Sequence, residues 1–130
     1  EGLCRIVLLH HPPVGAVAWR KRLTDADAFR RVLAAQGAEL VLHGHDHTTT
    51  YETLPGRDGP VPVFGIASAS QAIAGKRPAA QYRLFLIVPS PRGWQLDIAL
   101  RAYDPATGRF NEVAVETLDL PRACRQKRAL

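Results

Sequence analysis

The sequence predicts an α/β fold in which one strand-helix-strand unit is followed by an antiparallel sheet of hairpins. Two apolar runs, residues 3–11 and 39–42, both lead into histidines, and a segment with helical spacing lies between them. From residue 48 onward, apolar residues alternate with polar ones, and clusters of proline, glycine and aspartate separate the runs. This change of period indicates that hairpins follow a parallel unit.

The strand-helix-strand unit has signals at each of its boundaries. Pro12-Pro13 prevents the strand over residues 3–11 from continuing. The helix is expected over residues 25–36, with Thr24 or Asp25 as its cap and Gly37 at its end. Its apolar residues at helical spacing are Ala28, Phe29, Val32, Leu33 and Ala35. A helical crossover favours parallel strands, so both carboxyl ends are expected at one edge of the sheet.

The second part of the chain reads as hairpins and turns. Strands are expected over residues 48–54, 61–66, 81–88, 94–103 and 110–118. Turns are expected over residues 55–60, 89–93 and 104–108. Residues on one face of the strand over 94–103 are expected in the core: Trp94, Leu96, Ile98, Leu100 and Ala102.

Histidines at the ends of both apolar runs point to a metal site. His10 or His11 is expected to meet His45 and His47, and Gly44 is expected to let the backbone turn tightly between them. Neutral imidazoles suit zinc, manganese or iron, and three of them can hold one ion with a water in the fourth position. The alternative is that these histidines only cap their strands as solvated or hydrogen-bonded residues.

Three other residues near this edge are candidates for supporting roles. His11 and His43 are expected to orient ligands or to contact a phosphate group. Arg20 lies in a basic loop over residues 14–22 and could attract a phosphate ester, although a plain surface loop explains this segment as well. Asp46 is expected to point away from its neighbouring histidines and is not proposed as a ligand.

The phrases His10-His11-Pro12-Pro13 and Gly44-His45-Asp46-His47 resemble the last two motifs of the calcineurin-like metallophosphoesterases. The resemblance is to their bacterial cyclic-nucleotide phosphodiesterase branch and runs from about residue 3 to about residue 103. It implies half of a four-layer αββα metallophosphoesterase sandwich. It also implies that His10 and His45 bind one metal ion, that His47 binds a second, and that a metal-activated hydroxide attacks a phosphoester.

The family's upstream motifs are not found in this sequence. They are an Asp-X-His motif, a Gly-Asp motif with a bridging aspartate, and a Gly-Asn-His-Asp/Glu motif with the catalytic histidine. The chain also lacks methionine. We therefore interpret it as the carboxyl-terminal half of a longer enzyme, with two divalent ions (Mn, Fe or Zn) in the intact protein. This chain alone is expected to bind at most one ion weakly, to contain no catalytic residue and to be inactive.

Composition sets the outer bounds on function. The 130 residues, 46% hydrophobic and 22% charged, are typical of one globular domain, which we place at residues 1–120. Residues 121–130 form a basic tail, and outside it 13 basic side chains face 12 acidic ones, so nucleic acid is not an expected partner. No apolar run is long enough to span a membrane.

The cysteine content bears on the cellular compartment, and the motifs bear on the expected partners. Cys4 and Cys124 are too few for a disulfide framework, which favours reduced thiols and the cytoplasm. The expected partners are a small phosphoester and the missing amino-terminal half of the same domain. The alternative function is a non-enzymatic β-rich module for interaction or for binding a single metal ion.

Overall fold

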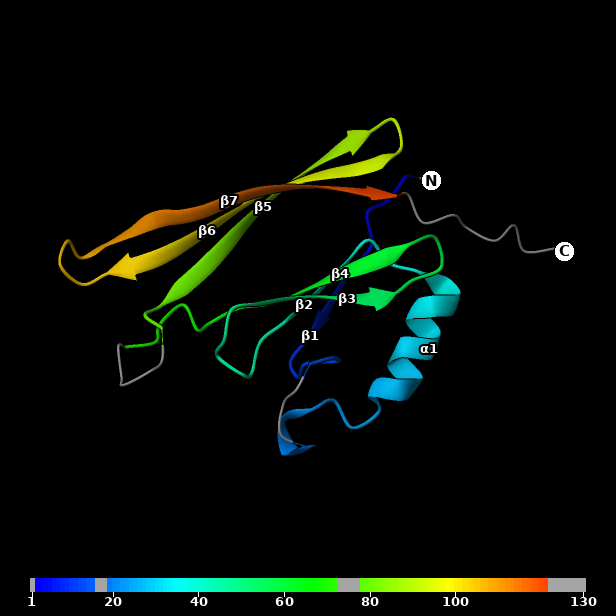
Figure 1. The fold of residues 1–130 in the computed structure, drawn as a ribbon, viewed down its shortest axis with the longest axis horizontal. Coiled ribbons are helices and arrows are strands. Elements are labelled where there is room, and N and C mark those ends of the chain that lie inside the picture. The colour runs from blue at the N-terminus through cyan, green and yellow to red at the C-terminus, as the bar shows by residue number, and fades with distance from the viewer. Residues whose placement is uncertain (1, 16–18, 73–77, 122–130) are drawn as a thin grey trace, which may run out of the picture.

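The structure, a computed structural model, describes residues 2–15, 19–72 and 78–121, which form three layers (Figure 1). Helix α1 lies on one face of a four-stranded mixed sheet, and a three-stranded antiparallel sheet lies on the other (Figure 1). The elements are β1 (Ile6–Leu9), the 3₁₀ helix η1 (Trp19–Lys21), α1 (Ala26–Gln36), β2 (Leu40–His43), β3 (Thr50–Pro55), β4 (Pro60–Gly65), β5 (Gln81–Ser90), β6 (Gly93–Asp104) and β7 (Arg109–Pro121). The predicted α/β class, a strand-helix-strand unit plus hairpins, is confirmed.

The four-stranded sheet, called here the first sheet, has the order β1-β2-β4-β3. Strands β1 and β2 are parallel, with Ile6 beside Leu40 and Leu9 beside His43. Strand β4 is parallel to β2 on its other side, and β3 is antiparallel to β4. The carboxyl ends of β1 and β2 therefore lie next to each other, as the crossover predicted.

Helix α1 covers the outer face of the first sheet. Its buried Leu33 packs in one core cluster with Val41 of β2 and Val63 of β4. The N–H of Gly37 donates to the carbonyl of Leu33 at 2.7 Å, and Gly37 has a φ of 71°. A positive φ suits glycine, so the predicted end of the helix is confirmed. Asp25 is the N-cap residue but makes no side-chain capping bond.

A second core cluster lies between the two sheets. It consists of Leu40, Phe64, Trp94, Leu96, Ile98 and Leu120. The predicted alternation in β6 is confirmed at Trp94, Leu96 and Ile98. Leu100 and Ala102, which we expected in the core, are only half-buried. Their end of the β5-β6-β7 sheet, called here the second sheet, extends past the first sheet, so no described residue covers it fully (Figure 1).

Strand β1 is shorter and more exposed than the sequence predicted. We expected a buried strand over residues 3–11, but the strand spans Ile6–Leu9, and Ile6 and Leu8 are 43% and 73% exposed. The reason is that β1 is an edge strand with β2 as its neighbour. Within the described part of the chain, little packs over the side of β1 that faces the second sheet.

A partly buried ion pair joins the starts of the two parallel strands. The carboxylate of Glu39, which is 2% exposed, accepts a bond from the Arg5 backbone N–H at 2.6 Å. The Arg5 guanidinium also donates to it through Nε at 3.3 Å. Arg5 further donates from Nη1 to the carbonyl of Gln36 at 2.7 Å. These bonds fix the register of β1 against β2 and the end of α1.

Two further boundaries differ from the predictions. Part of the loop over residues 14–22 forms the 3₁₀ helix η1, although we expected no helix there. Strand β7 runs to Pro121 rather than to 118. The predicted basic tail lies almost wholly outside the described residues. No helix in the described ranges is long and apolar enough to cross a membrane.

Candidate metal centre

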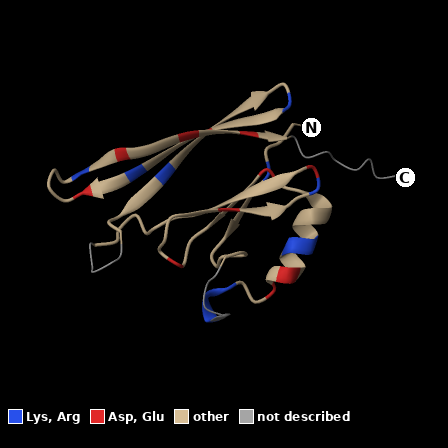
Figure 2. Ribbon diagram, in the orientation of Figure 1, with Lys and Arg blue, Asp and Glu red and all other residues tan. Residues whose placement is uncertain are grey.

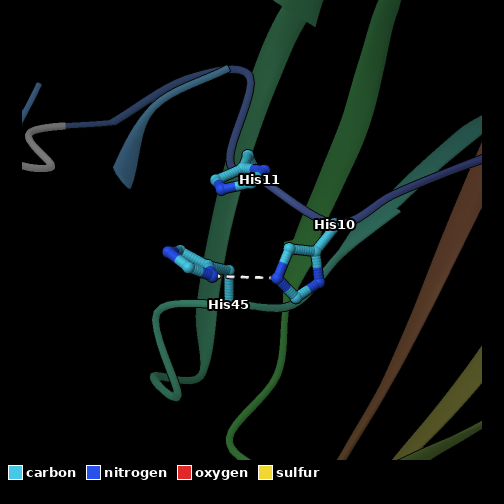
Figure 3. Close-up of side chains that lie close together, drawn as sticks. All are labelled: His10, His11 and His45. Atoms are coloured by element: carbon cyan, nitrogen blue, oxygen red, sulfur yellow. Dashed lines mark hydrogen bonds between the residues drawn. The ribbon is translucent and has the colours of Figure 1, made fainter. Parts of the chain in front are cut away.

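Three histidines come together at the carboxyl edge of β1 and β2 (Figure 3). The ligand nitrogens of His10, His11 and His45 all lie within 4.8 Å of one another. His45 Nδ1 and His10 Nε2 are 2.9 Å apart, which is hydrogen-bond distance. The ring of His11 lies 4.3 Å from that of His45 and 4.8 Å from that of His10, between centroids. We call these three residues the histidine cluster.

The topology of the first sheet explains why these residues meet. Strand β1 ends at Leu9, which is paired with His43, the last residue of β2. The histidines that follow each strand therefore leave the sheet side by side. Pro12 and Pro13 are fully buried and fix the direction of the chain after His11.

The turn after β2 takes its shape from histidines and not from glycine. His45 and His47 have φ angles of 66° and 54°, whereas Gly44 has no positive φ. The expectation that Gly44 provides the tight turn is therefore wrong. Left-handed conformations are uncommon for residues other than glycine, although histidine adopts them more readily than most. Such strained residues cluster at functional sites, which fits the position of this turn.

An ion pair fastens the basic loop to this turn. Lys21 Nζ on η1 donates to the Asp46 carboxylate at 2.8 Å. Asp46 is therefore directed toward Lys21 and is not part of the histidine cluster. Arg20 lies beside Lys21 on η1 and is exposed. Figure 2 shows η1 as a basic segment set apart from the charges of the second sheet.

His47 has a different partner from the one that the sequence suggested. We expected it to meet His10 and His45, but its Nδ1 lies 3.1 Å from Gln71 Oε1. Gln71 in turn donates from Nε2 to the carbonyl of Pro78 at 2.7 Å. In the structure, His10 thus lies within hydrogen-bond distance of His45. His11, which we expected in a supporting role, lies where we expected His47.

The signal for His11 was present in the sequence as the His10-His11 doublet. We expected His10 or His11 to meet His45, and the structure brings both of them to it. Strand β1 stops at Leu9, so both rings of the doublet reach the same site. They contact each other edge to face at an interplanar angle of 88°.

His43 lies beneath the turn and outside the histidine cluster. It is 8% exposed, and its Nδ1 is 3.2 Å from the carbonyl oxygen of Gly44. Gly65, its partner on β4, leaves room for the ring, since a Cβ there would stand 2.7 Å from His43 Cε1. His43 is thus placed to support the turn that carries His45.

The electrostatics of the histidine cluster favour a neutral ring at His45. Desolvation lowers the pKa of His45, and the charges of His11, His10 and Lys21 lower it further. A neutral imidazole keeps a lone pair free for a metal ion. Three imidazole nitrogens this close together fit one zinc, manganese or iron ion. Among the described residues no carboxylate joins the cluster, so the donor set does not fit a bridged pair of ions.

A cavity of about 490 Å³ opens beside the turn and between the sheets. Its lining includes His45 and His47 from the turn, together with Phe64 and Phe85 from the two sheets. Arg83 also lines it and donates from Nη1 to the carbonyls of Gly65 at 2.9 Å and Thr50 at 3.2 Å. Its guanidinium lies 4.7 Å from the centroid of the Phe64 ring. Burial lowers the pKa of Arg83.

The similarity of this chain to known proteins is structural. No protein-family model and no curated protein sequence matches the chain. The structure is similar to the crystal structure of Chaetomium thermophilum Vps29, with a TM-score of 0.46 and 16% sequence identity. The match covers 94% of this chain and 57% of the Vps29 chain, so this chain spans little more than half the length of that protein.

Proposed function

We propose that this chain supplies metal ligands to a metal-dependent phosphoesterase, active as the intact parent protein. The observation that carries the proposal is the histidine cluster, in which His10, His11 and His45 meet at the ends of two parallel strands. Carboxyl ends of parallel strands are the usual position of ligand sites in α/β sheets. The resemblance of the two histidine motifs to calcineurin-like metallophosphoesterases gives the reaction class.

Each part of this edge has a role in the proposal. The histidine cluster holds one ion, which when bound polarises a phosphoryl oxygen and activates a water molecule. Lys21 and Arg20 on η1 bring positive charge to the same edge and attract the anionic ester. His43 supports the turn from below. The substrate is a small phosphodiester or phosphomonoester, and the bacterial cyclic-nucleotide branch of the family is the nearest guide to it.

A second ion requires ligands from elsewhere in the parent protein. The described residues offer the cluster no bridging carboxylate. We propose that an amino-terminal half of the same domain supplies the carboxylates and the catalytic histidine, and that His47 then binds the second ion. The pair of ions would be Mn, Fe or Zn. Cys4 is a free thiol whose pKa burial raises, which suits the reducing cytoplasm where we place the protein.

The test is hydrolysis of bis-p-nitrophenyl phosphate or a cyclic nucleotide in the presence of manganese. It compares this chain, a polypeptide extended upstream to include the missing motifs, and the extended polypeptide carrying His45→Ala. We expect activity only in the unsubstituted extended protein, because positioning and electrostatics supply most of phosphoryl-transfer catalysis. Equal activity of the short and extended chains, or an unimpaired His45→Ala variant, would refute the assignment.

A second candidate is a module that binds one metal ion without turnover. The absence of a carboxylate from the histidine cluster, within the described residues, favours it. The same assay separates the two candidates. A parent protein that binds metal through His45 but hydrolyses neither substrate would support the module and contradict the enzyme.

A further inference from the structure

The turn after β2 contains two residues in an unfavourable backbone conformation. His45 and His47 have φ angles of 66° and 54°, and Asp46 lies between them. The left-handed region costs free energy for residues other than glycine. Such a conformation persists only where the surrounding contacts hold it. The contacts of this turn therefore determine whether His45 stays in the histidine cluster.

Contacts with distant residues fix this turn relative to the rest of the chain. A local bond, from the Asp46 N–H to the carbonyl of Gly44 at 2.9 Å, joins residues only two positions apart and cannot do so. Two side-chain contacts outside the histidine cluster reach further along the chain. His47 lies within hydrogen-bond distance of Gln71 at the end of the turn, and Asp46 pairs with Lys21 at its centre. The second contact therefore acts directly between the two strained residues.

The contact between Lys21 and Asp46 is a well-formed ion pair. Lys21 Nζ lies 2.8 Å from Asp46 Oδ1, a length typical of a charge-assisted hydrogen bond. The two side chains are 40% and 25% exposed, so water reaches both of them only in part. Salt screens partly buried pairs less than fully exposed ones. The ion pair therefore contributes to the stability of the turn.

The position of Lys21 connects the two segments that form the histidine cluster. Helix η1 belongs to the segment that begins with Pro12, directly after His11. The N–H of Leu23 donates to the carbonyl of Pro12 at 3.2 Å and closes this segment at its base. Pro12 is fully buried, which fixes the base against the first sheet. Lys21 thus links the segment that follows His11 to the turn that carries His45.

We propose that the Lys21–Asp46 ion pair holds the turn in the conformation that presents His45 to the metal ion, so that both are positioning residues of the metal site. The proposal rests on the proposed function and adds to it. A ligand that is already in place binds its ion more tightly, because no part of the binding free energy is used to order it. This role is separate from the attraction of an anionic ester.

The charges of the ion pair allow the proposal to be tested by the sign of an effect. Through space, Lys21 repels a cation at the histidine cluster and Asp46 attracts it. Both charges reach His45, since Lys21 lowers the pKa of that ring and Asp46 raises it. If charge alone mattered, removal of Lys21 would strengthen metal binding. If the ion pair orders the turn, the same change weakens it.

Lys21 is a better position for substitution than Asp46. Glu52 lines the same small cavity as Asp46, of about 150 Å³, and forms no ion pair within the described ranges. It therefore offers Lys21 a second carboxylate when Asp46 is replaced. A change at Lys21 removes the ion pair whatever Glu52 does.

The first experiment measures zinc binding to this chain by titration calorimetry. Lys21→Met removes the charge and keeps the length of the side chain, and should bind zinc about threefold more weakly or worse. Lys21→Arg keeps the charge and the N–H donors, and should bind zinc as the wild type does. Asp27→Asn, which removes the pair with Arg30 on α1, is the matched control and should change nothing.

The second experiment measures hydrogen exchange of the Asp46 amide in the metal-free chain. This N–H is bonded to Gly44 only while the turn is formed, so its exchange reports opening of the turn. Exchange should be about threefold faster or more in Lys21→Met and unchanged in Lys21→Arg and Asp27→Asn. Loss of a positive charge by itself attracts less hydroxide and slows exchange, so a faster rate identifies opening.

Zinc binding that is unchanged or tighter in Lys21→Met overturns the proposal, and so does an unchanged exchange rate of the Asp46 amide. A wild-type chain that binds no zinc would contradict the proposed metal site instead. The exchange rates of the metal-free chain then show separately whether the ion pair holds the turn. Circular dichroism of each variant checks that the fold is intact.

Discussion

The first sheet of this molecule carries the candidate metal site, whereas the second sheet packs against it. The first sheet is covered by α1 on one face and by the second sheet on the other, and parallel pairing brings the ends of β1 and β2 together. Every histidine of the chain lies on this sheet or in the segments that follow its strands. The second sheet is antiparallel and buries one face. The ends of the parallel strands thus form the candidate site. The antiparallel strands of the second sheet support the first sheet and form part of the molecular surface.

The largest expected effect comes from the core between the two sheets. Phe64→Ala should destabilise the chain by about 3–5 kcal/mol, because the buried ring packs against Phe85 and beneath Arg83. Phe110→Ala, at an exposed position of β7, is the matched control and should cost about 1 kcal/mol. Urea unfolding of both variants measures the difference. Equal costs would mean that the core between the two sheets contributes no more to stability than an exposed ring on β7.

The next effect tests the register of the parallel strands. Glu39→Gln keeps the size of the side chain but removes the charge that Arg5 contacts, and should cost about 2 kcal/mol. Glu112→Gln, which changes the exposed pair with Arg101, should cost less than about 0.5 kcal/mol. Thermal unfolding separates them. A neutral Glu39→Gln variant would show that this ion pair does not hold β1 in place.

The smallest effect contrasts two glycines near the site. A Cβ at Gly65 would meet the Thr50 hydroxyl and the ring of His43, so Gly65→Ala should cost roughly 1–2 kcal/mol. Gly44→Ala meets nothing within 4 Å and requires no positive φ, so it should cost little. Chemical denaturation measures stability, and the NMR shifts of the His43 ring report its displacement. A costly Gly44→Ala would restore the role we first gave to that glycine.

Much of the fold could be predicted because its signals are local. The apolar runs, the helical spacing over residues 25–36 and Gly37 identified the crossover unit, and the alternation in β6 identified the hairpins. Burial was harder to predict. The residues of β1 look like those of a central strand, and only the strand order shows that Ile6 and Leu8 lie at an edge.

The position of the candidate site could be predicted from the sequence, but not which three histidines form it. Parallel pairing was enough to bring His10 to His45. The choice between His11 and His47 depends on where β1 stops and on the backbone angles of the turn, which no periodicity encodes. His47 also lies within hydrogen-bond distance of Gln71. These two residues come together only in the folded chain, so no local sequence pattern predicts their contact.

The central claim is that His10, His11 and His45 together hold one metal ion. Titration calorimetry of this chain with zinc tests it most directly, with His11→Ala and His47→Ala as a matched pair. We expect one ion per chain, at least about tenfold weaker binding in His11→Ala, and nearly unchanged binding in His47→Ala. Two ions per chain, or weaker binding in His47→Ala with His11→Ala unaffected, would contradict the account.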